Sequence, residues 1–117
     1  MKYIGEDENG NVYHIYLDSI SSKYNRIFDD LDFNVACLIE FSDYESNRES
    51  VHGVKPYGCF QYMMFRKHKT DRLYRISKKA LITQNGNILK TYPSTWWNWI
   101  KRNTIIEKIF EETYYEL

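Results

Sequence analysis

The 117-residue sequence has only two cysteines, two prolines and five glycines. The glycines are scattered singly, which excludes a glycine-rich loop that would bind phosphate. Cys37 and Cys59 form no Cys-x-x-Cys pair, and none of the three histidines pairs with a cysteine or another histidine at the spacing of a structural zinc site. We therefore expect no bound metal, no cofactor and no enzymatic activity. The two cysteines are expected to be buried free thiols.

Long apolar runs are also missing, because no segment approaches the roughly 18 apolar residues that cross a membrane. The N-terminal sequence MKYIGEDENG is acidic and polar, unlike a signal peptide. We expect a cytoplasmic protein with no membrane partner. Alanine, glycine and proline are scarce, whereas lysine, asparagine, isoleucine and tyrosine are abundant. AT-rich codons produce this balance, which favours a phage, a mobile element or an AT-rich bacterium as the source.

The length is that of one domain, residues 1–117, with a single core that buries roughly two-thirds of the unfolded surface. The formal net charge is zero, but the charges are segregated along the chain. Residues 1–50 hold 4 basic and 11 acidic side chains, residues 51–110 hold 12 and 2, and residues 111–117 add three acids. Either the acidic and basic elements pack together and neutralise each other, or two oppositely charged faces each steer a partner.

Residues 59–79 predict a β-hairpin, in which apolar and polar residues alternate around a turn at Thr70-Asp71. One face, with Met63 and Phe65, would go to the core. The other face would be basic and aromatic, with Arg66 opposite Arg75, a like-charge pair that costs up to about 1 kcal/mol without an anion across it. This face is the candidate nucleic-acid or anion site, and its residues are Tyr62, Arg66, His68, Arg75 and Lys79.

Two further hairpins are predicted around Asn-Gly pairs, whose residues accept positive φ in a tight turn. The first joins residues 2–6 to 12–17, and the second joins residues 80–83 to 88–92. The sequences ENGNVYHIY and QNGNILKTY align over nine residues. Either a duplicated unit or the shared turn chemistry explains this likeness.

A helix is predicted over residues 19–31, where apolar residues recur at the spacing of one helical face. Asp29, Asp30 and Asp32 would then lie at its C-terminal end, where negative charge opposes the helix dipole by about 0.3–1 kcal/mol. One interpretation is a solvated end or contacts with the basic hairpin of the same chain. The other is an acidic patch that binds a basic partner surface.

Residues 33–41, FNVACLIEF, predict a central strand covered on both sides. The expected core residues are Cys37, Leu38, Ile39, Phe65 and Ile76. Residues 42–58 are polar and contain turn signals, so we expect a mobile loop with a role in recognition.

The C-terminal segment predicts a helix from Ser94 or Thr95, or two helices if the capping box at 104–107 starts a second. On a continuous helix Trp96 and Trp99 share the buried stripe, whereas Trp97 projects away from it. We therefore expect Trp97 to be exposed and to serve, with the acidic patch, as an anchor for a protein partner.

These elements predict an α+β fold: a single domain with an antiparallel, mostly meandering sheet of five to seven strands, one helix after the first hairpin and a C-terminal helical segment. Two functions fit this pattern. The first is a non-enzymatic protein-binding module, such as a stoichiometric inhibitor or immunity-type protein that acts on a host or competitor enzyme that handles nucleic acid. The alternative is a module that binds single-stranded RNA or DNA with its basic-aromatic face.

Overall fold

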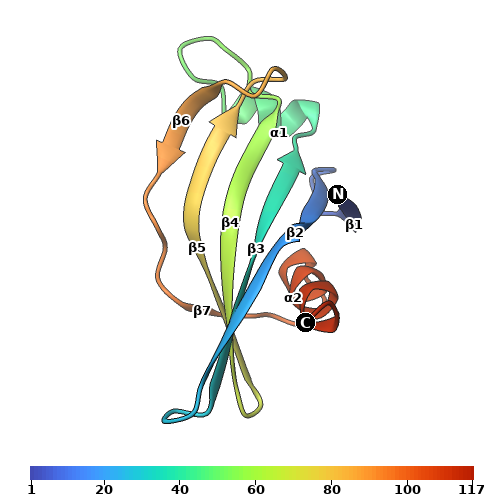
Figure 1. Cartoon of the computed structure of the whole chain (residues 1–117). Helices are drawn as coiled ribbons and strands as arrows, with labels where there is room; N and C mark the ends of the chain where they lie inside the picture. The colour runs from blue at the N-terminus through green and yellow to red at the C-terminus, as the bar shows by residue number, and fades with distance from the viewer.

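An antiparallel sheet of seven strands forms most of the protein, and the computed structural model describes all residues, 1–117 (Figure 1). The first six strands lie side by side in sequence order, and the seventh pairs with the fifth. The strands are β1 (Lys2–Glu6), β2 (Val12–Asn25), β3 (Asp30–Glu40), β4 (Gly58–His68), β5 (Asp71–Ile82), β6 (Ile88–Tyr92) and β7 (Asn98–Trp99). The helices are α1 (Asp43–Arg48) and α2 (Ile105–Tyr115). The predicted α+β class, with a mostly meandering sheet, a helix after the early strands and a helical C-terminus, is confirmed.

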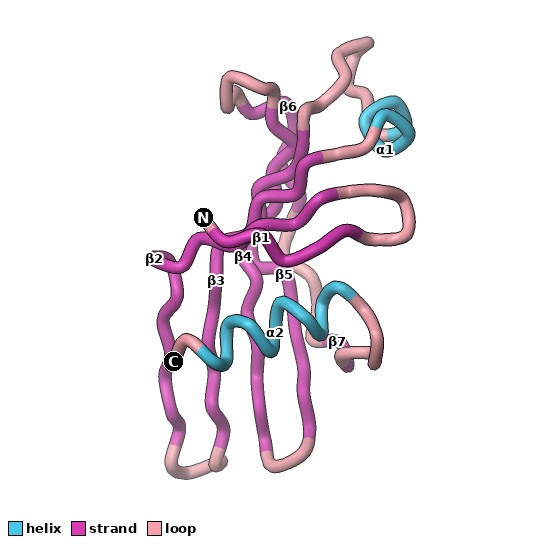
Figure 2. Tube along the Cα trace, turned by 90° about the vertical axis from the view of Figure 1, so that its right-hand side faces the viewer, coloured by secondary structure: helices cyan, strands magenta, loops and turns pink.

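The core lies between α2 and one face of the sheet, which we call the inner face (Figure 2). Phe110 of α2 packs against Phe33 and Phe65, with ring centroids 5.1 and 5.5 Å apart. Ile109 and Phe110 are buried, as are Val35 and Phe65 of the sheet. The opposite face of the sheet, the outer face, has no helix packed on it. The single helical layer therefore leaves one face of the sheet open.

The helix predicted over residues 19–31 is wrong, because β2 continues through this segment to Asn25 and pairs with β3 from Ser21 to Asn25. The register shifts between Tyr16 and Ser21, and the pairing ends at the turn before Asp30, where Asp29 has a φ of 53°. Pairing with β3 satisfies the backbone of β2 through a ladder, and this tertiary contact overrides the weak helical spacing. Ile27 and Phe28, which the helical pattern would bury, are 87% and 63% exposed at the tip.

The segment 42–58 is also more ordered than predicted, because it contains α1 and a β-bridge between Val51 and Val54. Ser42 caps α1 by accepting a hydrogen bond from Glu45 N at 3.2 Å. Its hydroxyl thus satisfies one of the helix's first unpaired amides.

Residues 93–100 run as an extended segment along the edge of β5, so the predicted helix from Ser94 is wrong (Figure 1). Thr95 N donates to Ile76 O at 2.9 Å, and Ile76 N donates back to Thr95 Oγ1 at 2.9 Å. Ile100 N donates to Arg72 O at 3.1 Å. These bonds satisfy an edge strand that would otherwise expose its backbone.

Helix α2 begins later, at the predicted capping box. Thr104 Oγ1 accepts from Glu107 N at 3.2 Å, while Glu107 Oε1 accepts from Asn103 N at 3.1 Å. The C-terminal segment therefore holds one helix of 11 residues that follows an extended strap.

The central hairpin is confirmed, but its turn lies at Lys69-Thr70, so that His68 pairs with Asp71 and Arg66 with Leu73. The predicted Arg66–Arg75 pair is therefore wrong, although a shift of two residues keeps each of them on its predicted face. A bulge between Tyr62 and Met63 then changes the register. Beyond it Tyr62 pairs with Lys78, and Lys79 moves to the inner face opposite Gln61.

The strand predicted at 33–41 corresponds to β3, in which residues 35–37 are fully buried. Of the expected core residues, Cys37, Ile39 and Phe65 are buried. Leu38 and Ile76 are only half-buried. Leu38 alternates with its buried neighbours and therefore points to the open outer face.

Candidate functional site

The outer face carries aromatic and charged side chains that lie in register across β2 to β5. Residues paired across neighbouring strands project from the same side of the sheet, so each row of partners forms a strip across the face. The upper rows are aromatic, and the lower rows are charged. The rows are His14–Leu38–Phe60–Ala80, Tyr16–Ala36–Tyr62–Lys78, Asn34–Met64–Arg75, Lys23–Asp32–Arg66–Leu73 and Asn25–Asp30–His68–Asp71.

Trp97 lies on the lower part of this face between two arginines. The guanidinium carbon of Arg66 is 4.5 Å from the centre of the Trp97 ring, and that of Arg75 is 5.7 Å from it. These are cation–π distances. Trp97 is half-buried, so the prediction that it is the exposed tryptophan is wrong. The reason is the extended strap, which places Trp97 against the sheet, whereas a helix would have turned it outward.

Two of the three acids that were predicted to meet a partner are paired within the chain. Asp32 accepts two hydrogen bonds from Arg66, Nε to Oδ1 at 2.8 Å and Nη2 to Oδ2 at 2.9 Å. This bidentate bond raises the pKa of Arg66 above its already high ordinary value. Asp30 Oδ1 lies 2.6 Å from His68 Nδ1. Asp29, in the hairpin turn, accepts a hydrogen bond from the Tyr24 hydroxyl.

No helix ends at these acids, so the predicted unfavourable interaction between their charges and a helix dipole is wrong. Their local role is instead to balance the basic hairpin, as the first interpretation held. Asp32 and Asp30 lie directly opposite Arg66 and His68 in the β3–β4 ladder. The cross-strand register thus explains both ion pairs.

The structure brings four of the five basic-aromatic residues together on the outer face. Tyr62 is 40% exposed, and Arg66, His68 and Arg75 are partly exposed below it. Lys79 is separated from them because the bulge turns it to the inner face. A hollow of about 190 Å³ beside this set is lined by Asp32, Asn34 and Met64, among others.

Sequence reasoning missed most of the exposed apolar surface of this face and its margins. Phe60 contacts Tyr16 and Tyr62 with ring centroids 5.7 and 5.4 Å apart, forming an aromatic strip. Trp96 and Trp99 are 86% and 64% exposed on the strap. The alternation in β4 could have revealed Phe60, which shares the parity of Tyr62. The exposure of the two tryptophans had no local signal, because it depends on the pairing of the strap with β5.

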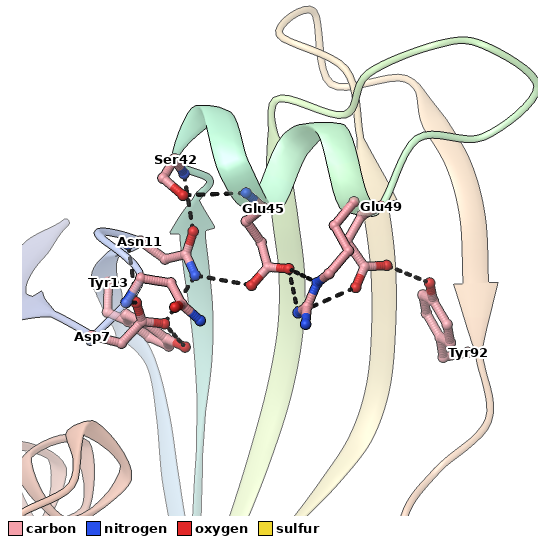
Figure 3. A network of polar contacts seen from close by, with 9 residues as sticks. Asp7, Asn11, Tyr13, Ser42, Glu45, Glu49 and Tyr92 are labelled. Atoms are coloured by element: carbon pink, nitrogen blue, oxygen red, sulfur yellow. Dashed lines mark hydrogen bonds and ion pairs between the residues drawn. The ribbon is translucent and has the colours of Figure 1, made fainter.

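A second cluster of polar residues lies on the inner face near the end of the sheet beside α1 (Figure 3). Asp7 accepts hydrogen bonds from Asn9 N, Asn11 N, Asn11 Nδ2 and the Tyr13 hydroxyl at 2.9–3.2 Å. Partial burial of the Asp7 carboxyl acts to raise its pKa, but these hydrogen bonds outweigh it, so the pKa of Asp7 lies below its ordinary value.

The same network continues from Asn11 into α1. Asn11 Nδ2 donates to Glu45 Oε1 at 3.2 Å, and Asn11 Oδ1 accepts from Ser42 N at 2.9 Å. Glu45 also pairs with Arg48. Tyr92 of β6 donates to Glu49 Oε2 at 3.3 Å (Figure 3). The network therefore ties the first turn of the chain to α1 and β6.

Both cysteines are buried free thiols, as predicted. Burial raises the pKa of Cys37 to about 12, and a thiolate at Cys59 would add to this by charge repulsion. Burial also raises the pKa of Cys59 to about 11, although nearby Lys79 acts in the opposite direction. Both groups are consequently protonated at neutral pH and are poor nucleophiles.

No cluster of three or more histidine, cysteine or acidic side chains is arranged as metal ligands would be. Neither helix has the length and apolar character needed to span a membrane. Comparisons of the chain with models of protein families, with curated proteins and with solved structures found no match. Function must therefore be inferred from the geometry of the two faces.

Proposed function

We propose that this protein is a protein-binding module that contacts its partner with the outer face of the sheet. The observation that carries the proposal is the open outer face itself, which combines an aromatic strip with the Arg66–Trp97–Arg75 stack. Tyrosine, tryptophan and arginine are the residues that most often dominate the energy of protein interfaces. Here all three types lie together on a face that no helix covers.

The charges of the outer face favour a protein over nucleic acid as the partner. Arg66 and His68 already have carboxylate partners in Asp32 and Asp30, so neither is free to neutralise a phosphate. Arg75, which stacks on Trp97, and the exposed Lys78 form no ion pair within the chain. A mixed surface of this kind suits the polar rim and aromatic centre of a protein interface.

In its specific form, the proposal is a stoichiometric inhibitor or immunity-type protein that acts on an enzyme that handles nucleic acid. The mixed acidic and basic rows of the lower outer face suit a partner that carries charged surfaces of its own. Such a partner would be met by the aromatic strip and by the exposed Trp96 on the strap.

The test is capture of a partner from a nuclease-treated lysate of the source organism with the immobilised protein. Tyr62→Ala and Trp96→Ala are each expected to weaken capture by at least about tenfold in affinity, as loss of an aromatic anchor does. Tyr115→Ala is the control, because Tyr115 is an aromatic residue on the C-terminal helix that is 79% exposed, close to the 86% of Trp96.

A partner that binds wild type and the Tyr115 variant but neither the Tyr62 variant nor the Trp96 variant would support the proposal. Capture that all three variants retain would contradict the proposal. So would capture that is seen only from a lysate without nuclease treatment. The unfolding free energy of each variant is measured first. We expect it to change by no more than about 0.5 kcal/mol at these exposed positions.

A further inference from the structure

The inner face contains a cleft that the outer-face proposal does not use. It has a volume of about 200 Å³ and opens between α1 and the start of α2. Its apolar side chains come from strands β2 to β5 and from α2. The apolar lining includes Ile39, Phe41, Tyr74, Ile76 and Ile106. Ile76 is only half-buried because it borders this space.

The carboxylates at the rim of the cleft are already engaged. Asp7 accepts four hydrogen bonds from its own turn and from Tyr13. Glu45 accepts from Asn11 and Arg48, and Glu49 accepts from Tyr92. A cationic ligand would have to displace these donors, so the rim offers it no free acceptor.

Two donors at the floor of the cleft are not engaged in this way. Gln61 is only 3% exposed, and the one hydrogen bond of its side chain is a long contact of 3.9 Å from Cys59 Sγ to its amide oxygen. Its amide nitrogen therefore faces the cleft without an acceptor from the chain. The amide nitrogen is not among the fully buried side-chain atoms that lack a partner, so an acceptor in the cleft can reach it.

Lys79 lies directly opposite Gln61 in the β4–β5 ladder and lines the same cleft. Its ammonium group forms no ion pair with a carboxylate of the chain; its close neighbour is the Tyr92 ring, 4.9 Å from Nζ to the centroid. The position results from the bulge at Tyr62, which turns Lys79 inward and Lys78 outward. A cation without an ion pair and an amide donor thus lie at paired positions in the lining of one cleft.

We propose that the inner cleft binds a small aromatic or aliphatic carboxylate, whose charged group is held by Gln61 Nε2 and Lys79 Nζ. The apolar body of the ligand packs against Ile39, Tyr74 and Ile106. Seven of the 14 lining residues are hydrophobic, and a concave site that combines an apolar wall with convergent polar groups can hold a small molecule. The site is separate from the outer face, and its test is independent of the partner proposed there.

The test is an NMR titration of the full chain with phenylacetate, followed through the side-chain amide signals of Gln61. Phenethylamine, which carries the same ring with the opposite charge, is the control ligand. We expect phenylacetate to shift the Gln61 signals in a saturable way, and phenethylamine to bind at least about tenfold more weakly, because the cleft offers donors to a charged acceptor.

Lys79→Met keeps the length and apolar stem of the side chain and removes its charge. It should weaken phenylacetate binding by at least about tenfold, as loss of a charge-assisted hydrogen bond does. Lys78→Met is the matched control, because the neighbouring lysine faces outward opposite Tyr62 and should leave binding unchanged. Equal binding of both ligands, equal binding by the two variants, or unmoved Gln61 signals at millimolar phenylacetate would each overturn the proposal.

Discussion

Arg66 shows how one side chain joins the basic hairpin, the acidic turn and the tryptophan strap. Its guanidinium donates two hydrogen bonds to Asp32 and stacks on Trp97. The Asp32 and Arg66 side chains are 30% and 34% exposed, so solvent screens much of their attraction. The pair therefore contributes modestly to stability and mainly fixes the orientation of the guanidinium under Trp97.

Replacing Asp32 tests whether the acids serve the fold or a partner. We expect Asp32→Asn to lower the free energy of unfolding by about 1 kcal/mol or less, as a partly exposed pair with good geometry does. Asp29→Asn is the control, and it should change stability by less than about 0.5 kcal/mol because asparagine tolerates the positive φ of this turn. Urea denaturation of both variants measures the difference.

Partner association completes this test. If Asp32 serves only to pair with Arg66, the Asp32→Asn variant should be less stable than the Asp29→Asn variant. Its rate of association with the captured partner should then equal that of wild type. An Asp32 variant of unchanged stability with slower association would instead assign the acids to the binding surface, because a charge in the interface acts on the on-rate.

At the scale of elements, local signals predicted hairpins well and long-range pairing poorly. Both Asn-Gly turns and the capping box at Thr104 were found because a few neighbouring residues determine them. The second half of β2 and the strap at 93–100 were mistaken for helices, because their conformation depends on β3 and β5. Neither partner can be identified from a short window of sequence.

Helix α1 was missed although its own signal was present. Ser42 is followed three residues later by Glu45, which is the pattern of a capping box. The many turn residues after Arg48 concealed it.

The candidate face was only partly predicted. A two-residue error in the position of the turn kept Arg66 and Arg75 on the correct face, whereas the bulge at Tyr62 exchanged the faces of Lys78 and Lys79. Bulges leave little trace in a single sequence.

The turn between β1 and β2 offers a prediction on pH, because Asp7 organises it. Its carboxyl has a lowered pKa in the folded protein. The stability that it contributes is therefore present above the unfolded-state value of about 3.9, and it is lost as the pH falls through the lower folded-state value. We expect Asp7→Asn to lower stability at pH 7 by on the order of 1 kcal/mol, as loss of hydrogen bonds to a charged group does.

As the pH falls below about 3.9 and through the lower folded-state pKa, the stability difference between the variant and wild type should shrink, because the carboxyl is then increasingly protonated in both states. Denaturation by urea across pH 2–7 measures this convergence. A stability difference that stays constant over the whole range would show that the Asp7 charge has no role in the turn, and that only its shape matters.

At the scale of the whole molecule, the segregated charges of the sequence are brought together by the fold. The acidic first segment meets the basic hairpin at Asp32–Arg66 and Asp30–His68, and the acidic C-terminus meets Lys2 through Glu112, 2.7 Å from Nζ. The sequence alone could not distinguish such neutralisation from two charged faces. On the lower outer face the result is a near balance, because Lys23, Arg66, Arg75 and Lys78 face Asp30, Asp32 and Asp71.

This balance leads to a prediction about nucleic acid that separates the two functions considered for the outer face. Cations outnumber carboxylates there by only one, so we expect wild type to bind a single-stranded oligothymidylate weakly. The logarithm of its affinity should fall with the logarithm of salt concentration with a slope no steeper than about −1.5. Removing the acids with Asp30→Asn and Asp32→Asn frees Arg66, and should steepen the slope by about 0.7 for each additional phosphate that the protein neutralises.

The control for this double variant is Glu6→Gln with Glu8→Gln, which makes the same change in net charge at exposed positions of the first turn, away from the outer face. Fluorescence anisotropy over a range of salt concentrations measures all three proteins. The control should keep the shallow slope of wild type, because its charges lie outside the proposed contact area. If wild type already binds tightly with a steep slope, and Arg75→Ala abolishes this binding, the outer face is a nucleic-acid surface and the protein-binding proposal is wrong.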